Sequence, residues 1–283
     1  MKTKILLAAT LLLSLQMQAQ QLEKPKQIPI KGSFTNPVVS PDGNYVLLTK
    51  EHLKGVYLLN LKNKKITQIS DKDGSGYAYS WNPNSTSFYY KEKGEKEYFS
   101  NSKVKSYSLK TKKAKTLNEI NHNSLPSFKG KEQTKIVVYT NPATLKIEAK
   151  DVKTQKSWNI TNEDGQFYNA ILSHDGKKVA VHNGADIYVY PIEGNGKGIK
   201  IGTGIATAWS KDNKYLIGFL DESKDGHSVT NSDLYLFNAA TAKSVKLTAT
   251  ANVIEMFPCF YDDNKIMFTD DKTGKIFTSQ LKL

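Results

Sequence analysis

A short corner motif recurs along this chain and limits the folds that it can adopt. Its first copy, residues 38–48, reads VVSPDGNYVLL and sets a tight polar turn between two apolar runs. Asp, Asn and Gly suit such a corner because they tolerate left-handed backbone conformations and hydrogen-bond their own backbone. Further copies, each followed by a β-rich run, occupy residues 80–84, 126–131, 171–176, 208–213 and 259–264. A turn that recurs in this way predicts a repeat fold.

The residue immediately before each corner supports this alignment. It is apolar in every copy and mostly aromatic: Val39, Trp81, Phe128, Leu172, Trp209 and Phe260. Successive copies lie 37 to 51 residues apart, which is the size of a four-stranded propeller blade. Third and fourth strands are expected after the first two, for example at 56–59 and 66–70. We therefore interpret Trp81 and Trp209 as core residues.

The pattern predicts an all-β protein, a six-bladed β-propeller of four-stranded antiparallel blades. No segment after the first nineteen residues shows helical periodicity over ten residues. The last unit reaches residue 283 at the end of its third strand, and residues 27–32 show the alternation of a fourth strand. We expect this N-terminal strand to complete the last blade and close the ring, which protects the sheet edges. Seven blades remain the alternative if residues 90–107 contain additional strands.

The corner resembles a known repeat. SPDG at 40–43, with echoes at 173–176 and 210–213, is similar to the WD40-like repeat of TolB-like β-propellers and of the propeller in dipeptidyl-peptidase IV-type enzymes. The resemblance covers essentially all of residues 20–283, which we expect to form a single propeller domain. We expect no counterpart of the α/β domain of TolB or of the hydrolase domain of those peptidases. The resemblance thus implies a stand-alone propeller that acts as a binding scaffold.

The N-terminal residues 1–19 are typical of a secretory signal peptide. Lys2 and Lys4 precede an apolar run at 5–15, and a short polar stretch ends at Ala19. No later segment is apolar enough for a transmembrane anchor. We expect a periplasmic or secreted protein after cleavage near Ala19.

The positive charge does not indicate nucleic-acid binding. The formal net charge is +13, but every basic residue is lysine, and the lysines are scattered over turns and strands. Without arginine the chain lacks the bidentate fork that reads phosphates and guanine edges. Cys259, the only cysteine, lies between Pro258 and Phe260, and we expect a buried thiol.

Histidines suggest one alternative function. The sequence places His52, His182 and His227 between second and third strands and His122 between blades, in loops that share one face of a propeller. A shared divalent metal would favour a metal-assisted lyase or hydrolase acting on a polysaccharide, and the resemblance extends to TolB-like lyases of acidic sugars that use histidines and a metal. No pair has the H-x₃-H spacing of metal ligands, so we expect no cofactor.

A second metal candidate starts at Asp71. Asp71, Asp73 and Ser75, followed by Gly76, match the first half of a calcium loop. Position twelve is Asn82, where a bidentate glutamate belongs, so the sequence favours a plain turn.

Two insertions stand out on the same predicted face. One, at 91–101, contains Glu92, Tyr98 and Phe99; the other, at 220–231, contains Asp221, Glu222, Asp225 and His227. They belong to blades two and five, which are opposite in a six-bladed ring, and we hypothesise that they form the walls of a binding groove. The leading prediction is a non-catalytic scaffold that binds a protein, peptide or glycan of the cell envelope.

Overall fold

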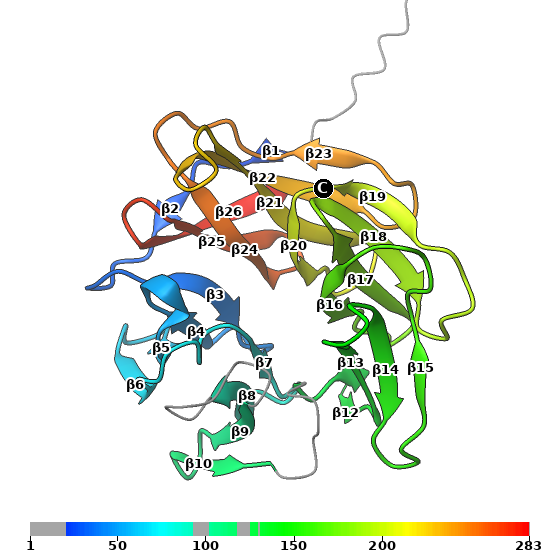
Figure 1. The fold of residues 1–283 in the computed structure, drawn as a ribbon. Coiled ribbons are helices and arrows are strands. Elements are labelled where there is room, and N and C mark those ends of the chain that lie inside the picture. Colours follow the sequence, from blue (N-terminus) through cyan, green and yellow to red (C-terminus); the bar gives the residue numbers. More distant parts are fainter. Residues whose placement is uncertain (1–20, 93–101, 118–124, 130, 283) are drawn as a thin grey trace, which may run out of the picture.

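Antiparallel strands make up the fold and form six blades around a ring (Figure 1). The computed structural model describes residues 21–92, 102–117, 125–129 and 131–282. These residues form strands joined by turns, with one 3-10 turn, η1 (Glu51–Leu53). The prediction of an all-β, six-bladed propeller is confirmed.

The first, second, fourth and fifth blades are four-stranded sheets whose strands follow chain order from the centre of the ring outward. They contain β3 (Thr35–Val39), β4 (Tyr45–Thr49), β5 (Val56–Asn60) and β6 (Ile66–Ser70); β7 (Tyr79–Trp81), β8 (Ser87–Glu92), β9 (Lys103–Ser108) and β10 (Lys113–Thr116); β16 (Phe167–Leu172), β17 (Lys178–Asn183), β18 (Asp186–Pro191) and β19 (Ile199–Thr203); and β20 (Ile205–Trp209), β21 (Tyr215–Ser223), β22 (Val229–Asn238) and β23 (Ser244–Lys246). β8 pairs directly with β9 within one blade, and the described residues form six blades, so the seven-bladed alternative is wrong.

The last blade joins the two ends of the chain. It contains β24 (Glu255–Asp262), β25 (Lys265–Asp270) and β26 (Lys275–Lys282), with β1 (Gln21–Leu22) and β2 (Lys26–Gln27) both pairing to β26. The Ile28 amide continues this edge and donates to the Ile276 carbonyl at 2.8 Å. Closure by an N-terminal strand is confirmed, although the pairing starts at Gln21 rather than at residue 27. The reason is the length of β26, which offers an edge for two short strands instead of one.

The third blade is less regular than the repeat predicted. β13 (Ile136–Thr140), β14 (Ile147–Asp151) and β15 (Ser157–Asn159) form a three-stranded sheet. Among the described residues, β11 (Phe128–Lys129) and β12 (Glu132–Gln133) pair only with each other. The Phe128 ring lies 5.9 Å from the ring of Tyr89 in the second blade. The pre-corner residue therefore contacts the preceding blade even where the corner is irregular.

One backbone hydrogen bond recurs in every blade. An amide at the end of the third strand donates to a carbonyl in the corner between the first and second strands, with N–O distances of 2.7 to 2.9 Å. The pairs are Leu61 to Asn44, Leu109 to Thr86, Val152 to Lys135, Ile192 to Lys177, Ala239 to Lys214, and Leu281 to Asn264. The corner and the turn after the third strand therefore lie together at one end of each blade.

Corners of neighbouring blades also touch. The Asp42 amide donates to the Ser85 hydroxyl at 3.0 Å, and the His174 amide donates to Oδ1 of Asn213 at 2.7 Å. These bonds place the corners on one face of the ring, which we call the corner end. The opposite face, formed by turns between second and third strands and by the connections between blades, we call the loop end; there the Gly55 amide donates to the Lys72 carbonyl at 3.0 Å.

Charge is unevenly divided between these two ends. In the turns of the corner end, lysines outnumber carboxylates more than two to one. The lysines are Lys62, Lys64, Lys65, Lys110, Lys112, Lys131, Lys135, Lys153, Lys156, Lys177, Lys197, Lys211, Lys214 and Lys243. The carboxylates are Asp42, Glu132, Asp175, Glu193, Asp212 and Asp263. Most of the net positive charge of the described chain therefore lies at the corner end.

Two tryptophans connect neighbouring blades through hydrogen bonds. Trp81 and Trp209 are 7% and 3% exposed, which confirms them as core residues. Nε1 of Trp81 donates to the Val38 carbonyl at 3.0 Å, and Nε1 of Trp209 donates to the Ile171 carbonyl at 2.9 Å. In each pair the acceptor belongs to the preceding blade. The indole thus buries apolar area while its one donor is satisfied across the blade interface.

Cys259 is buried, as predicted, and burial raises the pKa of its thiol to about 12.

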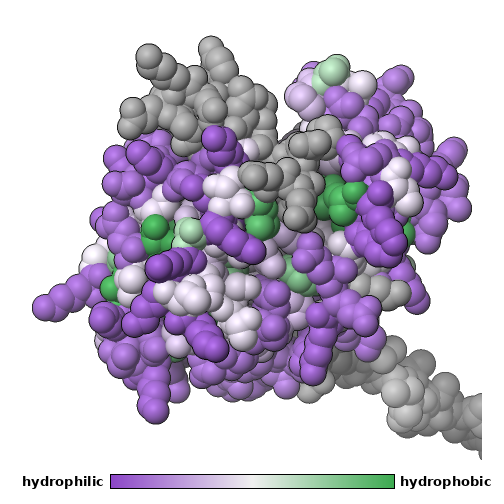
Figure 2. Space-filling model, turned by 90° about the horizontal axis from the view of Figure 1, so that it is seen from below, coloured by the Kyte–Doolittle hydropathy of each residue, from purple (hydrophilic) through white to green (hydrophobic). Residues whose placement is uncertain are grey.

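The described chain has no helix long and apolar enough to cross a membrane. Figure 2 shows the side of the ring that lies lowest in Figure 1. Hydrophilic residues cover most of this side, and hydrophobic residues are confined to small separate spots.

Candidate binding site at the loop end

The structure separates the predicted histidines. His52 lies in η1 with its side chain exposed, and His227 is exposed near the tip of the β21–β22 hairpin. His182 does not lie in a loop as the sequence suggested; it belongs to β17 and is fully buried. His122, Tyr98 and Phe99 lie outside the described residues.

His182 has a packing role between the fourth and fifth blades. Its Nε2 accepts a hydrogen bond of 2.9 Å from the Ala206 amide, and the ring of Tyr168 stacks on it at a centroid distance of 5.2 Å. Burial lowers the pKa of His182 to about 4. The imidazole is therefore neutral near pH 7, with its proton on Nδ1, and its Nε2 lone pair is already used.

The residues proposed for a calcium loop have other partners. Ser75 is buried and its hydroxyl donates to the Lys72 carbonyl at 2.8 Å, while Asp73 forms an ion pair of 3.5 Å with Lys54. Asp71 precedes this turn. Within the part of the chain that the structure describes, no three His, Cys, Asp or Glu side chains come together as a metal site.

Glu92, the described acidic residue of the first insertion, connects two blades. Its Oε1 accepts from the Ser70 hydroxyl at 2.8 Å, and its Oε2 lies 3.2 Å from Nζ of Lys105. The carboxylate is thus occupied within the protein. The remainder of that insertion, residues 93–101, lies outside the described residues. Of the two predicted walls of the groove, only residues 220–231 are therefore described in full.

The second insertion is the extended end of a hairpin. β21 and β22 pair as far as Ser223 and Val229, with Asp221 opposite Ser232 and Glu222 opposite Asn231. At the tip, Oδ1 of Asp225 accepts from the His227 and Ser228 amides at 2.8 and 2.7 Å. These bonds lower the pKa of Asp225 to about 2. Asp225 is therefore the residue that shapes the turn.

A buried carboxyl pair below this hairpin was missed by sequence reasoning. Asp233 and Glu255 are 4% and 1% exposed. Oδ2 of Asp233 lies 2.6 Å from Nζ of Lys246, and Oε2 of Glu255 accepts from the Thr248 hydroxyl at 3.3 Å. Burial, and next the charge of Asp233, raise the pKa of Glu255 to about 7. No motif or period in the sequence marks these two residues.

Two exposed tyrosines were also missed. Tyr77 and Tyr168 are 56% and 41% exposed, although most aromatic residues of the fold are buried. They come from the connection into the second blade and from β16 of the fourth blade. Burial raises the pKa of Tyr168, and Tyr77 adds to this rise. The Tyr168 hydroxyl donates to the Gly184 carbonyl at 2.8 Å, which fixes its ring.

Bulges in the innermost strands hold both tyrosines. Asn36 and Asn169 each lie three residues before a pre-corner residue and have a φ of 51°. Nδ2 of Asn36 donates to the Gly76 carbonyl at 3.2 Å, next to Tyr77, and Nδ2 of Asn169 donates to the Ala206 carbonyl at 3.0 Å. Asn tolerates this left-handed conformation. A repeated Asn in this column is the sequence signal that could have located the site.

Leu145 is a further exposed apolar residue of the loop end. It is 38% exposed, and its carbonyl accepts from the Phe167 amide at 2.8 Å, next to Tyr168. We call Tyr77, Leu145 and Tyr168 the mouth patch, since the first strands that two of them adjoin face the centre of the ring (Figure 1).

The loop end carries no excess charge among its described turn and connection residues. Its lysines are Lys31, Lys50, Lys54, Lys72, Lys146, Lys224 and Lys272. Its carboxylates are Glu51, Asp71, Asp73, Glu163, Asp164, Asp225 and Asp271. A partner held here would be recognised through aromatic contact and hydrogen bonds rather than through net charge.

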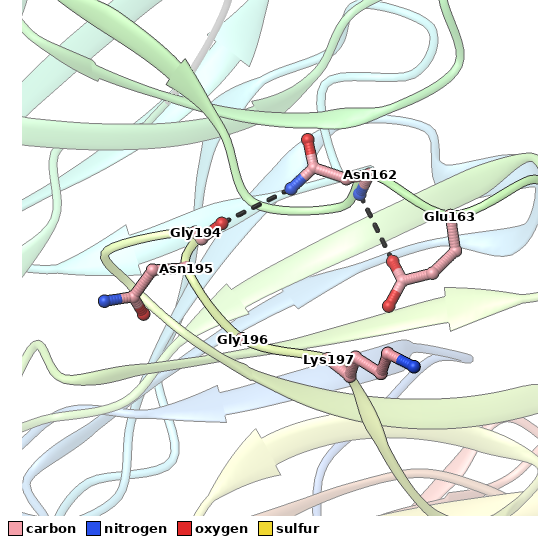
Figure 3. A pocket seen from close by; sticks show the side chains of 6 residues that line it. All are labelled: Asn162, Glu163, Gly194, Asn195, Gly196 and Lys197. Atoms are coloured by element: carbon pink, nitrogen blue, oxygen red, sulfur yellow. Dashed lines mark hydrogen bonds between the residues drawn. The ribbon is translucent and has the colours of Figure 1, made fainter.

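A shallow pocket of about 350 Å³ lies where the third and fourth blades meet (Figure 3). It is lined by Asn162, Glu163, Gly194, Asn195, Gly196 and Lys197. The Glu163 carboxylate accepts from the Tyr190 hydroxyl at 3.1 Å and from the Gly198 amide at 3.3 Å. Because this carboxylate already has partners within the protein, the pocket offers a ligand little beyond neutral amides and one lysine.

Comparison with known proteins identifies the fold. No protein-family description and no curated protein sequence matches the chain. Among solved structures, the β-propeller domain of Cps50 (Swd1) from Myceliophteria thermophila matches with a TM-score of 0.62 and 10% identity, over 93% of this chain and 100% of that one. A TolB protein from Agrobacterium tumefaciens matches with a TM-score of 0.56 and 14% identity, over 88% and 90%.

An oligogalacturonate lyase in complex with manganese also matches, with a TM-score of 0.52 and 13% identity, over 89% of this chain and 78% of that one. At such identities these likenesses establish the propeller fold. The TolB match agrees with the resemblance that the corner motif suggested.

Proposed function

We propose that this chain is an exported, non-catalytic binding propeller whose loop end holds a protein, peptide or glycan of the cell envelope. The mouth patch supports this proposal most directly. Tyr77 and Tyr168 come from different blades and both stay exposed, and Tyr77 adds to the raised pKa of Tyr168. Their backbones are held by the hydrogen bonds of Asn36 and Asn169. A rigid aromatic pair is suited to binding because it loses little conformational freedom when a partner docks.

The chemistry of the patch favours a partner with apolar or sugar faces. Tyrosine rings combine a large apolar face with a polar tip, and they pack equally well against sugar rings and apolar side chains. The balanced charge of the loop end favours neither strongly acidic nor strongly basic partners. We therefore place an uncharged glycan or a mixed peptide surface ahead of a polyanion at this end.

A metal-assisted lyase or hydrolase is the less supported alternative. It would require histidines and carboxylates that converge on one substrate. His182 is buried and bonded to Ala206, Glu92 is bonded to Ser70 and Lys105, and Asp225 is bonded to its own turn. Each is engaged in holding the fold, so a binding role fits the described loop end better and needs no cofactor.

The proposed location follows from the N-terminal residues. Residues 1–19 have the charged start, apolar run and small-residue end of a signal peptide, with cleavage expected near Ala19. The mature chain, 20–283, would then work in the periplasm or outside the cell.

A retention experiment tests the proposal. The mature chain is immobilised and exposed to solubilised envelope proteins and to a glycan array. Bound material is compared for the native chain and for the double variant that combines Tyr77→Ala with Tyr168→Ala. We expect the double variant to lose affinity by at least about tenfold, since each aromatic anchor contributes on the order of 1 kcal/mol or more.

Ile199→Ala is the matched control, because Ile199 is 55% exposed but lies on the outermost strand of the fourth blade. Its loss should leave retention unchanged. Equal retention by the native chain and the double tyrosine variant, with unchanged melting temperatures, would refute the assignment of the mouth patch.

A further inference from the structure

The corner end presents a positive surface that the proposed binding role does not use. Its turns carry more than twice as many lysines as carboxylates, whereas the described turns of the loop end are balanced. The two ends of the ring therefore differ in charge: the turns of the corner end are positive, and the described turns of the loop end are neutral. We propose that the corner end docks reversibly on an anionic lipid bilayer, so that the mouth patch points away from the membrane.

Three of the six carboxylates of the corner-end turns accept hydrogen bonds within their own turn. Oδ1 of Asp42, Asp175 and Asp212 accepts from the serine hydroxyl two positions earlier, at 2.6 to 2.7 Å. The same oxygens accept from backbone amides two positions later, at 3.0 to 3.1 Å. Each of these carboxylates therefore has one oxygen engaged within its own turn, and Oδ2 of Asp212 in addition lies 3.2 Å from Nζ of Lys214.

The lysines of these turns have the opposite geometry. Lys62, Lys65 and Lys153 are exposed in the turns after third strands, and lysine carries its charge on a long flexible stem. Because exposed lysines outnumber carboxylates in the turns of this end, the corner end as a whole is positive, which is complementary to a surface of lipid phosphates.

The residue types favour a lipid surface over a structured polyanion. Arginine, which provides bidentate phosphate recognition, does not occur, and the lysines are distributed over several blades rather than along one groove. A dispersed set of point charges on one face suits a planar array of anionic headgroups, where each lysine adds to the attraction within a Debye length of about 8 Å.

The attraction would be electrostatic without insertion into the bilayer. Within the described residues the large exposed apolar side chains are Tyr77, Leu145, Tyr168 and Ile199, and none of them belongs to a corner or to a turn after a third strand. Membrane anchoring by insertion needs such side chains. Docking through the corner end should therefore be sensitive to salt and reversible.

Vesicle flotation tests the proposal with the complete mature chain. The probes are vesicles of phosphatidylcholine alone and vesicles that also contain phosphatidylglycerol. We expect binding to the mixed vesicles at low salt, little binding to phosphatidylcholine, and release as salt is raised. Lack of binding by the native chain to the mixed vesicles overturns the proposal.

Two triple variants with equal net charge locate the surface. The first is Lys62→Gln, Lys65→Gln and Lys153→Gln at the corner end; the second is Lys31→Gln, Lys224→Gln and Lys272→Gln at the loop end. The corner-end triple should weaken binding to mixed vesicles roughly one hundredfold, and the loop-end triple less than about threefold. Equal weakening would show that only net charge matters and would overturn the docking surface.

A competition arm distinguishes lipid from free polymer. Soluble polyphosphate at matched phosphate concentration should displace the chain from mixed vesicles only weakly. Complete displacement, together with tighter binding to polyphosphate than to vesicles, would assign the corner end to an anionic polymer and overturn the lipid proposal. The result is independent of the mouth patch, because the tyrosine variants should float with mixed vesicles as the native chain does.

Discussion

Glu255 provides a test of how this propeller responds to pH. It starts β24, is 1% exposed, and lies near Asp233, which is itself buried. Burial and the charge of Asp233 raise the pKa of Glu255 to about 7, compared with an ordinary value of 4.5. The folded chain therefore keeps a proton on Glu255 between about pH 4.5 and pH 7, whereas the unfolded chain releases it.

The sign and size of the effect follow from this difference. Because the folded state binds the extra proton, the stability that Glu255 contributes is fully present below pH 4.5 and is lost as the pH rises from there to 7. A shift of this size corresponds to about 3 kcal/mol lost by pH 8, at 1.36 kcal/mol for each pKa unit. Nothing further should be lost above the folded-state pKa.

The perturbation is Glu255→Gln, which keeps the shape of the side chain and removes the charge. At pH 8 the variant should be more stable than the native chain by about 3 kcal/mol, and at pH 4.5 the two should agree to within about 1 kcal/mol. The free energy of unfolding is measured in urea by tryptophan fluorescence at several pH values between these limits.

Glu222→Gln is the control, since Glu222 is exposed on the neighbouring hairpin. It should leave the pH profile as in the native chain. A Glu255→Gln variant that is less stable than the native chain at pH 8, or whose difference from it does not change with pH, would refute the assignment of a buried, protonated carboxyl.

Two further predictions concern hydrogen bonds that hold the blades and their corners, and both are measured as free energies of unfolding in urea. Trp209→Phe removes the indole donor to the Ile171 carbonyl and some packing, and should cost about 2 kcal/mol; a change below about 0.5 kcal/mol would contradict a staple between blades. Asp212→Ala removes the acceptor of the Ser210 hydroxyl and the Lys214 amide and should cost about 1 kcal/mol, while Asp263→Ala should cost less if the hydrogen-bonded corner is what matters.

The fold could be predicted because its information is local. The corner motif is turn chemistry, and Asp42, Asp175 and Asp212 perform the same hydrogen bonding wherever they occur. Strand alternation then supplied the rest of each blade, and the apolar column containing Trp81 and Trp209 aligned the copies. The third blade departed from the pattern where its corner, at 126–131, had the weakest similarity to the others.

The site was less predictable because it depends on tertiary placement. His182 directly follows the apolar run 179–181, and as a polar residue near a predicted turn it is expected in a loop. The structure extends β17 to Asn183, and residues 179–182 are buried on both faces of this strand. Tyr77 and Tyr168 look like core aromatics in sequence, and their exposure arises from where the bulges at Asn36 and Asn169 set the first strands. Spacing along the chain does not report which aromatic faces outward.

Ring closure also determines when this protein can finish folding. Gln21 pairs with Lys282, so the last sheet joins segments from opposite ends of the described chain. Contacts of such long sequence separation form late, because a large loop must close before they contribute. Until β26 is in place, β1 and β2 have no strand to pair with and the ring stays open. Any condition that weakens the pairing of β26 should therefore expose unpaired strand edges at the last blade, which are sites for aggregation.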